Sequence, residues 1–378
     1  MRNGYTREMQ TVSAMVRFGL RSRPELGAFL GLSKGSVSRL VERLMRAGIV
    51  TAGGKLDQAQ PGRKRTALHV RPDLAYLVGA DLEGRALSAC VVDCGMNVVA
   101  RETLEVASQW SMSRIVGTWL DLVDRMVRDC GVPLEAIAGL GLGLPGLVSR
   151  GDFRIRAFMP PGRLVEFDLG SACARFPFPV TAANNVVCVS EFERRVGAGY
   201  GVPSFISVLA RYGIGAAVYA NGSFLIGEEG FTGEFGHMRI DAAGPVCICG
   251  QRGCLDVYAS GRTWLAGAAP EGAGRLRTVS RRGRYLAVAL ANVLKLFHPP
   301  VVIMNGIYNA HADIMAPVLK SGLRDELRPL GLTVPEVRFG APGPLKASIG
   351  AAYRAADAFL EKHLVAQAAA AALGAVTA

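Results

Sequence analysis

One histidine followed by three closely spaced cysteines constrains the fold of this chain more than any other feature. His237 precedes Cys247, Cys249 and Cys254, and one imidazole with three thiolates is a complete tetrahedral ligand set for zinc. A complete set leaves no open position for an activated water, so the pattern predicts a structural zinc ion (Zn2+) and not a catalytic one. The alternative is that the four residues are buried independently of one another.

The other cysteines and the start of the chain indicate where the protein works. Of the eight cysteines, those outside the cluster lie in largely apolar stretches and are expected to be small core residues: Cys90, Cys94, Cys130, Cys173 and Cys188. There is no paired disulfide framework, no apolar signal segment after Met1 and no run of roughly 18 apolar residues. We therefore expect a cytoplasmic protein with no membrane span. A length of 378 residues predicts two or three domains.

Positive charge is concentrated at the beginning of the chain. Residues 1–71 hold 14 Lys or Arg and 4 Asp or Glu, a net charge of +10 out of +12 for the whole chain. A short basic module joined to a nearly neutral body is typical of a nucleic-acid-binding domain on a carrier.

The same seventy residues have the pattern of a helix-turn-helix. Apolar spacing predicts a first helix over about residues 6–19, Ser22 and Glu25 form a capping box that opens a second helix, and Gly31 closes it. Ser33 caps a third helix, whose apolar stripe must face the core: Val37, Leu40, Val41 and Leu44. Two short helices joined by a tight turn predict that the second lies in the major groove of double-stranded DNA. A three-helix module that does not bind DNA is the alternative.

Polar residues on the exposed side of the recognition helix, and in a hairpin wing after it, are the candidate DNA contacts. On the helix they are Ser33, Lys34, Ser36, Ser38, Arg39 and Arg43. The wing is expected to hold the pair Gly53-Gly54 and a basic tract able to lie along a minor groove or the backbone, with Arg63, Lys64 and Arg65. A solvated charged loop is the alternative for this tract.

Downstream of residue 71, strand-like runs and helices alternate in two similar sets. The first set has strands over residues 77–82, 86–93, 97–101 and 137–142, a helix over about 113–130, and a last strand leading into Asn184. The second set begins with strands over residues 205–210 and 216–220 and includes a buried strand over 301–304. Hairpin strands followed by helices, occurring twice, predict two mixed α/β lobes with a cleft between them.

The residues around the cysteine cluster also carry a family resemblance. The run Glu234-Phe235-Gly236-His237, followed by Cys-x-Cys-Gly-x-x-Gly-Cys from Cys247 to Cys254, resembles the signature of the ROK family of repressors, open reading frames and sugar kinases. The turn Gly143-Leu144-Pro145-Gly146 and residues 298–306 and 348–352 extend the resemblance over most of the chain. It implies an actin-like, ribonuclease-H-like duplicated fold.

Within that resemblance, three departures from the kinases imply that phosphoryl transfer is lost. The first phosphate loop of the kinases resembles Asp-x-Gly-Gly-Thr-Lys, and here Glu83 follows Asp81 in place of the first glycine. The second resembles Gly-Thr-Gly-Ile-Gly, and here Arg211 and Tyr212 take the first two positions. Glycines are needed there because backbone amides must approach phosphate. The catalytic aspartate of the kinases aligns with Asn185, whose neutral amide cannot take a proton from a sugar hydroxyl, so no catalytic residue is expected.

The sugar cleft of the family is better kept than its phosphate loops. The expected effector-binding residues are Gly146, Asn184, Asn185, Glu234, His237 and Asp256. The resemblance gives His237 two roles, with one ring nitrogen on zinc and the other towards a sugar hydroxyl, and Asp256 stands where the family usually has Glu. The tryptophan that follows the Pro-Gly turn in the kinases has no match near residues 161–164. A relict pocket that binds nothing is the alternative.

Together these features predict a winged helix-turn-helix, mainly α, joined to an α/β two-lobed, actin-like ROK body. The expected domains are residues 1–71 for DNA binding, residues 72–185 for the first lobe, and residues 186–344 for the second lobe with the zinc loop and a dimerisation surface. A C-terminal helix over about residues 345–366 is expected to return to the first lobe.

The function expected from these features is regulation of carbohydrate genes. The protein should bind a pseudo-palindromic operator as a homodimer or tetramer, most simply as a repressor, under the control of a sugar or sugar derivative held between the lobes. One alternative is a ROK sugar kinase with a fused DNA-binding domain. Another is a ligand-independent DNA-binding regulator controlled by a protein partner.

Overall fold

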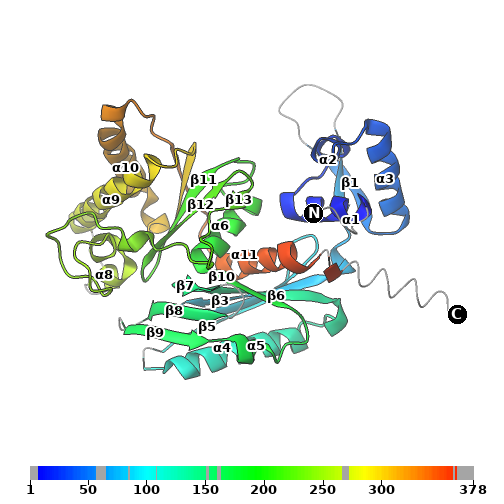
Figure 1. Cartoon of the computed structure of the whole chain (residues 1–378), viewed down its shortest axis with the longest axis horizontal. Coiled ribbons are helices and arrows are strands. Elements are labelled where there is room, and N and C mark those ends of the chain that lie inside the picture. Colours follow the sequence, from blue (N-terminus) through cyan, green and yellow to red (C-terminus); the bar gives the residue numbers. More distant parts are fainter. Residues whose placement is uncertain are drawn as a thin grey trace.

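The chain folds into a helical N-terminal region and two α/β units (Figure 1). The computed structural model describes residues 7–56, 65–83, 86–107, 109–149, 153–159, 163–265, 272–360 and 362–363. Within these ranges, no helix combines the length and the apolar character that crossing a membrane requires.

Three helices and a two-stranded antiparallel sheet form the N-terminal region: α1 (Arg7–Phe18), α2 (Arg23–Leu30), α3 (Lys34–Arg46), β1 (Val50–Leu56) and β2 (Arg65–Val70). The predicted caps are confirmed. The hydroxyls of Ser22 and Ser33 accept hydrogen bonds from the backbone amides of Glu25 and Ser36, and Gly31 adopts a left-handed φ of 64°. The apolar stripe of α3 is buried as predicted, so its polar face is left outside.

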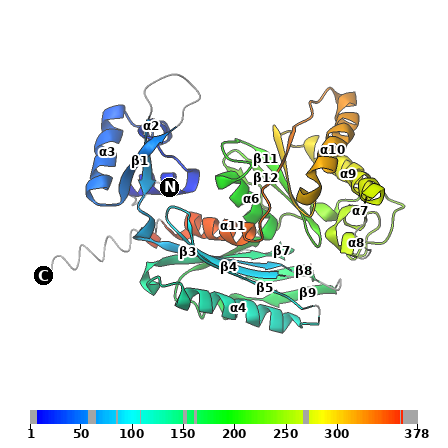
Figure 2. The same ribbon diagram turned by 180° about the vertical axis from the view of Figure 1, so that it is seen from behind.

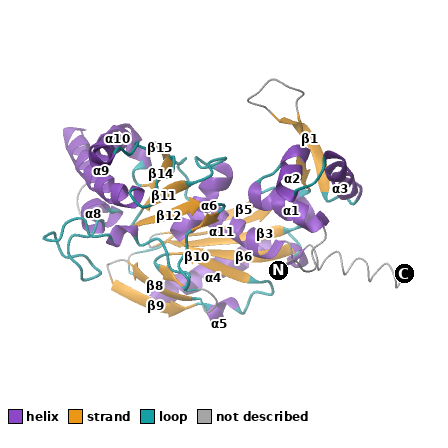
Figure 3. Ribbon diagram, turned by 45° about the horizontal axis from the view of Figure 1, so that its top comes forward, coloured by secondary structure: helices purple, strands orange, loops and turns teal. Residues whose placement is uncertain are grey.

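Strands β1 and β2 follow α3 and pack against the helices of this region (Figure 3). Gly53 and Gly54 lie within β1, at a register shift between Ala52 and Lys55. Residues 57–64, which include the predicted DNA contacts Arg63 and Lys64, lie outside the described residues, and the third predicted contact, Arg65, opens β2.

The first α/β unit is built on a five-stranded mixed sheet in the order β10-β6-β3-β4-β5. Its strands are β3 (Tyr76–Glu83), β4 (Ala86–Asp93), β5 (Val98–Glu105), β6 (Ile137–Leu144) and β10 (Val180–Asn184). The hairpin strands β3, β4 and β5 pair antiparallel, whereas β6 and β10 extend the sheet in parallel. Helices α4 (Met112–Asp129) and α5 (Gly170–Cys173) lie on one side of this sheet, where Trp119 of α4 is fully buried (Figure 1).

The second α/β unit repeats this plan with the order β13-β12-β11-β14-β15. Its strands are β11 (Phe205–Ala210), β12 (Ile214–Ala220), β13 (Ser223–Phe224), β14 (Val301–Gly306) and β15 (Glu336–Phe339). In both sheets, the strands that come third, second, first, fourth and fifth along the chain lie side by side in that order. The repeat confirms the expected ribonuclease-H-like duplication.

Helices cover the outer face of the second sheet: α7 (Asp256–Ala259), α8 (Gly261–Leu265), α9 (Gly272–Leu294) and α10 (Ala312–Leu327). Leu286 and Leu290 of α9 and Leu319 of α10 share an apolar core with Ile206 and Val208 of β11. The described residues also contain short 3-10 turns: Pro72–Leu74, Leu134–Ala136, Phe235–His237, Asn309–His311 and Arg328–Leu330.

A small antiparallel sheet near the cleft was not predicted. It consists of β7 (Leu147–Val148), β8 (Arg154–Met159) and β9 (Arg163–Asp168). Along β8 the side chains alternate between buried Ile155 and Ala157 and exposed Arg154 and Arg156, which is the period of a half-buried strand.

Two helices lie between the sheets: α6 (Asn185–Val196) and α11 (Lys346–Ala355), the latter continued by a π-helical turn over Ala356–Leu360 (Figure 2). Both pack with their backbones in direct contact with neighbours. A Cβ at Gly141 of β6 would lie 1.9 Å from the carbonyl oxygen of Ala351, and one at Gly350 would lie 1.8 Å from that of Cys188. Only glycine allows these approaches.

One apolar cluster packs the N-terminal region against the body. Val12, Met15 and Val16 of α1 belong to the same buried cluster as Leu77 of β3 and Ala356 beyond α11. The position of α1 is therefore set by the first sheet and the C-terminal helix together.

The close packing of α11 gives a test with a matched control. Gly141→Ala should lower the free energy of unfolding by more than about 2 kcal/mol, because the added methyl meets a backbone carbonyl that cannot turn aside. Gly117 of α4 has no atom within 4 Å of the same position, so Gly117→Ala should raise this free energy by about 0.5–1 kcal/mol. Urea denaturation compares the two midpoints, and equal midpoints would contradict the packing.

Candidate functional site

A cavity of about 320 Å³ lies between the two α/β units. All six predicted cleft residues line it: Gly146, Asn184, Asn185, Glu234, His237 and Asp256. They come from the end of β6, the start of α6 and the loop around the cysteine cluster, so the fold brings together segments far apart in the sequence. The volume is at the lower end of the range of roughly 300–1,000 Å³ that small-ligand sites occupy.

Asn184 holds the wall of the cleft together. Its Oδ1 accepts from the backbone amide of Val186 at 2.8 Å, which caps α6, and its Nδ2 donates to the carbonyl of Gly146 at 2.6 Å. Gly146 has a left-handed φ of 72°, and a Cβ there would lie 2.3 Å from the carbonyl oxygen of Arg156. Asn184 therefore positions the turn, and the half-buried Asn185 beside it also lines the cavity.

Two carboxylates form the opposite side of the cleft. Asp256 is buried, accepts from the backbone amide of Ile214 at 3.0 Å and from Arg262 at 3.1 Å, and burial raises its pKa to about 6 against the effect of Arg262. Glu234 keeps 40% of its side chain exposed, yet partial removal from water and the charge of Asp256 raise its pKa to about 7. Glu234 is thus the carboxylate available to a ligand, and Asp256 is the one that braces the loop.

The four predicted metal ligands meet at one point. Their ligand atoms all lie within 4.8 Å of one another, with 3.7 Å between Sγ of Cys249 and Sγ of Cys254 and 3.6 Å between Sγ of Cys247 and Nδ1 of His237. Tetrahedral zinc with Zn–S bonds of about 2.3 Å separates two sulfurs by about 3.8 Å. The spacing and the donor set fit such an ion.

Glycines allow the cysteine loop to turn tightly enough. Gly250 and Gly253 have left-handed φ angles of 87° and 67°. A Cβ at Gly253 would lie 1.5 Å from the carbonyl oxygen of Asp241, so no other residue fits beside Cys254.

His237 links the cluster to the cleft. Its Nδ1 faces Cys247, while its Nε2 lies 3.7 Å from Oε2 of Glu234 on the cleft side. The ring of Phe158 packs against the imidazole with 5.6 Å between centroids. Phe158 lines the cavity, so the cleft contains an aromatic ring although the sequence has no tryptophan near residues 161–164.

A buried ion pair joins the two units beside the cavity. Arg211, in the β11–β12 turn, lies 3.2 Å from Oδ2 of Asp81 and 2.9 Å from Oε2 of Glu83, which end β3. Burial raises the pKa of Asp81 to about 7, against the effect of Arg211. Glu83 and Arg211, the bulky residues at the two loop positions, therefore pair with each other, and the guanidinium group lies between the end of β3 and the β11–β12 turn.

Some of the candidate DNA contacts of α3 are exposed side chains, whereas others bond to neighbouring residues. Lys34 and Arg39 are exposed on the outer face. Ser33 donates to the hydroxyl of Ser36 at 3.0 Å, and Arg43 pairs with Glu8 of α1 at 2.6 Å. Ser38 is half-buried. Lys34 and Arg39 are the better placed members of the predicted set.

Sequence reasoning missed several cleft residues. Arg156 and Phe158 of β8, with Leu147, Leu164 and Ile248, also line the cavity. The alternation of charged Arg154 and Arg156 with apolar Ile155 and Ala157 is the sequence signal that could have predicted strand β8, whereas single apolar residues in loops carry no such signal.

Fold and site together define a two-lobed sugar-kinase-like body with a basic helical region at its N-terminus and a cysteine–histidine cluster beside the cleft. The profile of the ROK family matches residues 77–353. This chain belongs to the ROK family.

Two curated relatives are transcriptional regulators by name, one of them a repressor. The xylose repressor of Bacillus subtilis strain 168 is 28% identical over 324 residues, which cover 81% of this chain and 82% of that protein. The DNA-binding transcriptional dual regulator NagC of Escherichia coli K12 is 21% identical, covering 85% of this chain and 86% of its own.

Solved structures resemble this chain to different extents. A ROK family transcriptional regulator, a homologue of the Escherichia coli MLC protein, covers 95% of this chain and 99% of its own with a TM-score of 0.73 at 20% identity. The ROK hexokinase of Thermus thermophilus covers 74% of this chain and 97% of its own with a TM-score of 0.59 at 27% identity. The fold of this chain thus extends beyond the kinase-like body.

The Arg211 pair predicts a pH-dependent loss of stability. Arg211→Gln leaves Asp81, whose side chain is 3% exposed, buried beside Glu83 without a cation, which should lower the free energy of unfolding by about 3–5 kcal/mol. The pKa of Asp81, about 7, should rise further, and protonated Asp81 needs no cation. The loss should therefore be larger at pH 8 than at pH 5 in urea denaturation.

Arg125→Gln is the control for that measurement, because the pair of Arg125 with Glu102 is 41% and 39% exposed and should contribute less than about 1 kcal/mol. A loss in Arg211→Gln no larger than in the control, or the same at both pH values, would contradict the assignment.

Proposed function

We propose that this protein is a sugar-controlled transcriptional regulator that represses genes of carbohydrate metabolism. The observation that carries the proposal is a basic three-helix region seated directly on a two-lobed body whose cleft holds Asn185, Glu234 and His237. The names of the xylose and N-acetylglucosamine repressors support it, since both relatives cover most of this chain.

DNA binding is assigned to the N-terminal region, residues 1–71, as a winged helix-turn-helix. In this proposal α3 enters the major groove and presents Lys34 and Arg39, while Ser33, Ser36 and Ser38 and the wing residues contact the backbone or base edges. Two chains pair through the second lobe, residues 186–344, and place two such regions on a pseudo-palindromic operator.

Effector binding is assigned to the cleft between the second lobe and the first lobe, residues 72–185. Asn185 both donates to and accepts from hydroxyls, the Glu234 carboxylate accepts from them, and the Nε2 side of His237 faces the same space. A ring with several hydroxyl groups suits this lining, so we assign a monosaccharide or a simple derivative. Its binding alters the spacing of the lobes and thereby weakens DNA binding.

A structural zinc ion is assigned to His237, Cys247, Cys249 and Cys254. When bound, it would cross-link the cysteine loop and supply no reaction chemistry, because four protein ligands complete its coordination. The loop in turn holds Glu234 and Asp256 at the cleft. Three thiolates are consistent with a reducing cytoplasm, where we place the protein.

The proposal excludes sugar phosphorylation. Asn185 provides no carboxylate base, and Arg211 and Glu83 place bulky charged side chains where the kinases have glycine-rich phosphate loops. ATP turnover with any hexose would instead support a ROK sugar kinase fused to a DNA-binding region, in line with the similarity to the hexokinase.

Release of DNA by a sugar is the central test. Fluorescence anisotropy should show binding to DNA from upstream of the protein's own gene, and one of D-xylose, N-acetyl-D-glucosamine and D-glucose should weaken it by about 5- to 150-fold. At pH 8, above the Glu234 pKa of about 7, the same sugar should be needed at a concentration at least about tenfold higher in Glu234→Gln, because the charged acceptor is lost.

Glu102→Gln, on the outer strand β5, is the matched control and should respond like the wild type. DNA binding that no sugar changes, or a Glu234→Gln response equal to that of the wild type, would favour a regulator controlled by a protein partner.

Metal content tests the cluster separately. The purified protein should hold one zinc per chain by elemental mass spectrometry, and Cys254→Ser should lose it with a lower midpoint of thermal unfolding. Cys130→Ser, outside the cluster, should keep the metal. Equal zinc content in the two variants would refute the assignment.

A further inference from the structure

Helix α6 runs from the cleft to the N-terminal region. Its residues Asn185–Val196 span about 18 Å at a rise of about 1.5 Å per residue. It begins at the cleft residue Asn185, and near its end Arg195 contacts α1 and the segment beyond α11. A single rigid element thus reaches both sites to which the proposed function assigns binding.

The first turn of α6 contacts both walls of the cleft. On the side of the first unit, its cap Asn184 holds the carbonyl of Gly146. On the side of the second unit, Val186 packs against backbone, because a Cβ at Gly215 would lie 3.1 Å from Val186 Cβ and one at Gly233 would lie 2.9 Å from its Cγ1. A change in the width of the cleft therefore displaces this turn.

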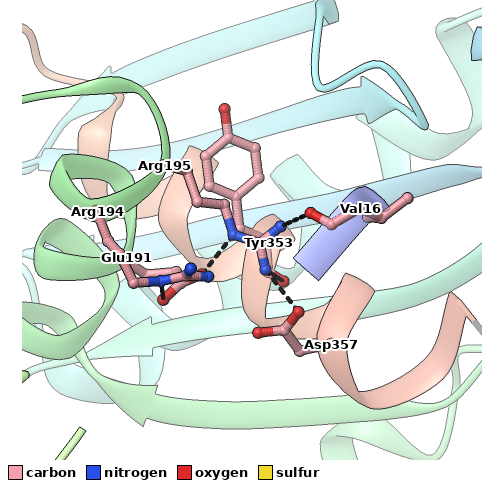
Figure 4. A network of polar contacts seen from close by, with 6 residues as sticks. All are labelled: Val16, Glu191, Arg194, Arg195, Tyr353 and Asp357. Carbon is pink, nitrogen blue, oxygen red and sulfur yellow. Dashed lines mark hydrogen bonds and ion pairs between the residues drawn. The ribbon is translucent and has the colours of Figure 1, made fainter. Parts of the chain in front are cut away.

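The last turn of α6 is fixed to the N-terminal region by Arg195 (Figure 4). Its guanidinium donates to the backbone carbonyl of Val16, to Oδ1 of Asp357 at 2.5 Å and to the carbonyl of Tyr353 at 3.4 Å. Its Nε donates to Glu191 of the same helix at 2.5 Å, and the side chain is only 6% exposed.

The bond to Val16 caps a helix from outside. Helix α1 ends at Phe18, so the carbonyl of Val16 is among the last four, which have no partner within the helix. A buried cation at that end also interacts favourably with the helix dipole. Arg195 thereby fixes the C-terminal end of α1, which packs on α3.

A second buried contact stiffens the end of α6. Glu193 accepts from Nζ of Lys346 at 2.5 Å and from the backbone amide of Ala198 at 2.7 Å, and Lys346 donates to Asn305 of β14 at 2.9 Å. With the backbone of Cys188 in contact with Gly350, the helix has little freedom to bend between its two ends.

We propose that α6 relays the state of the cleft to the DNA-binding region and that Arg195 is the positioning residue through which it does so. The inference rests on the proposed function, whose sugar control it explains. When the lobes change their spacing, the first turn of α6 shifts and the last turn carries Arg195 with it. The apolar cluster around α1 tolerates sliding because such contacts are not directional, whereas the hydrogen bond to Val16 is directional and moves α1 with it.

The first experiment needs no sugar. Hydrogen–deuterium exchange is measured for peptides covering residues 7–18 in the wild type, in Asn184→Ala and in Arg195→Gln. Both substitutions should speed exchange of these amides by at least about threefold, although Asn184 lies a helix length from α1. The double variant should exchange no faster than Arg195→Gln alone, because the same path is already broken.

Arg125→Gln is the control, since its pair with Glu102 lies on the outer side of the first sheet. Unchanged exchange of residues 7–18 in Asn184→Ala, or full additivity in the double variant, would overturn the relay. If circular dichroism shows that Arg195→Gln does not fold, Asp357→Asn replaces it, because it weakens the same guanidinium network from the other side.

The second experiment separates the relay from the proposed function. Fluorescence anisotropy measures DNA binding of the wild type, Arg195→Gln and Arg125→Gln in the presence of D-xylose, N-acetyl-D-glucosamine or D-glucose. Calorimetry measures the affinity of the same proteins for each sugar without DNA. Arg195→Gln should bind the active sugar within about threefold of the wild type, yet the sugar should weaken its DNA binding by less than about threefold.

A full sugar response in Arg195→Gln would overturn the relay while leaving the proposed function intact. A wild type that ignores all three sugars, with the exchange result as expected, would instead remove the sugar assignment and leave the mechanical connection standing.

Discussion

The direct backbone contact between α11 and the first sheet is the constraint on which the rest of the structure depends. Gly79 and Gly141 leave room for the helix, and Gly350 on the helix leaves room for α6 in turn. No side chains separate the first sheet, α11 and α6 at these positions, whereas side chains such as Val187 and Leu209 pack α6 against the second sheet. The cleft, the contact of Arg211 with the end of β3 and the position of α1 all depend on this stack of layers.

In the function we propose, the cleft binds a sugar without phosphorylating it. The end of β3 and the β11–β12 turn meet beside this cleft, and the contact between them is the cation of Arg211 with two carboxylates. A buried guanidinium group stabilises the fold only while its carboxylate partners stay paired with it, so this contact favours one separation of the lobes. In the function we propose, that preferred separation is the resting state against which a bound sugar acts.

Much of the fold and of the site could be predicted from local patterns. The caps at Ser22 and Ser33 and the cysteine spacing depend on residues close in sequence, and the structure places them as predicted. What could not be predicted are the contacts between residues that lie far apart in the sequence. Arg211 and Asp81 are 130 residues apart. Because Glu83 and Arg211 occur in the sequence as two separate departures from glycine-rich loops, the ion pairs between these segments could not be predicted. In the same way, nothing local shows that the amide of Asn184 is occupied by a turn 38 residues upstream.

The seat of α1 has a consequence for biosynthesis. Helix α1 leaves the ribosome well before the cluster that holds it is complete, because that cluster includes Ala352, Ala355, Ala356 and Leu360. Its contact with Asp357 through Arg195 has the same requirement. A nascent chain, or one truncated before residue 352, therefore lacks the contacts that orient its basic helices. The helices take their orientation only after residues 352–360 have been synthesised and have packed against α1.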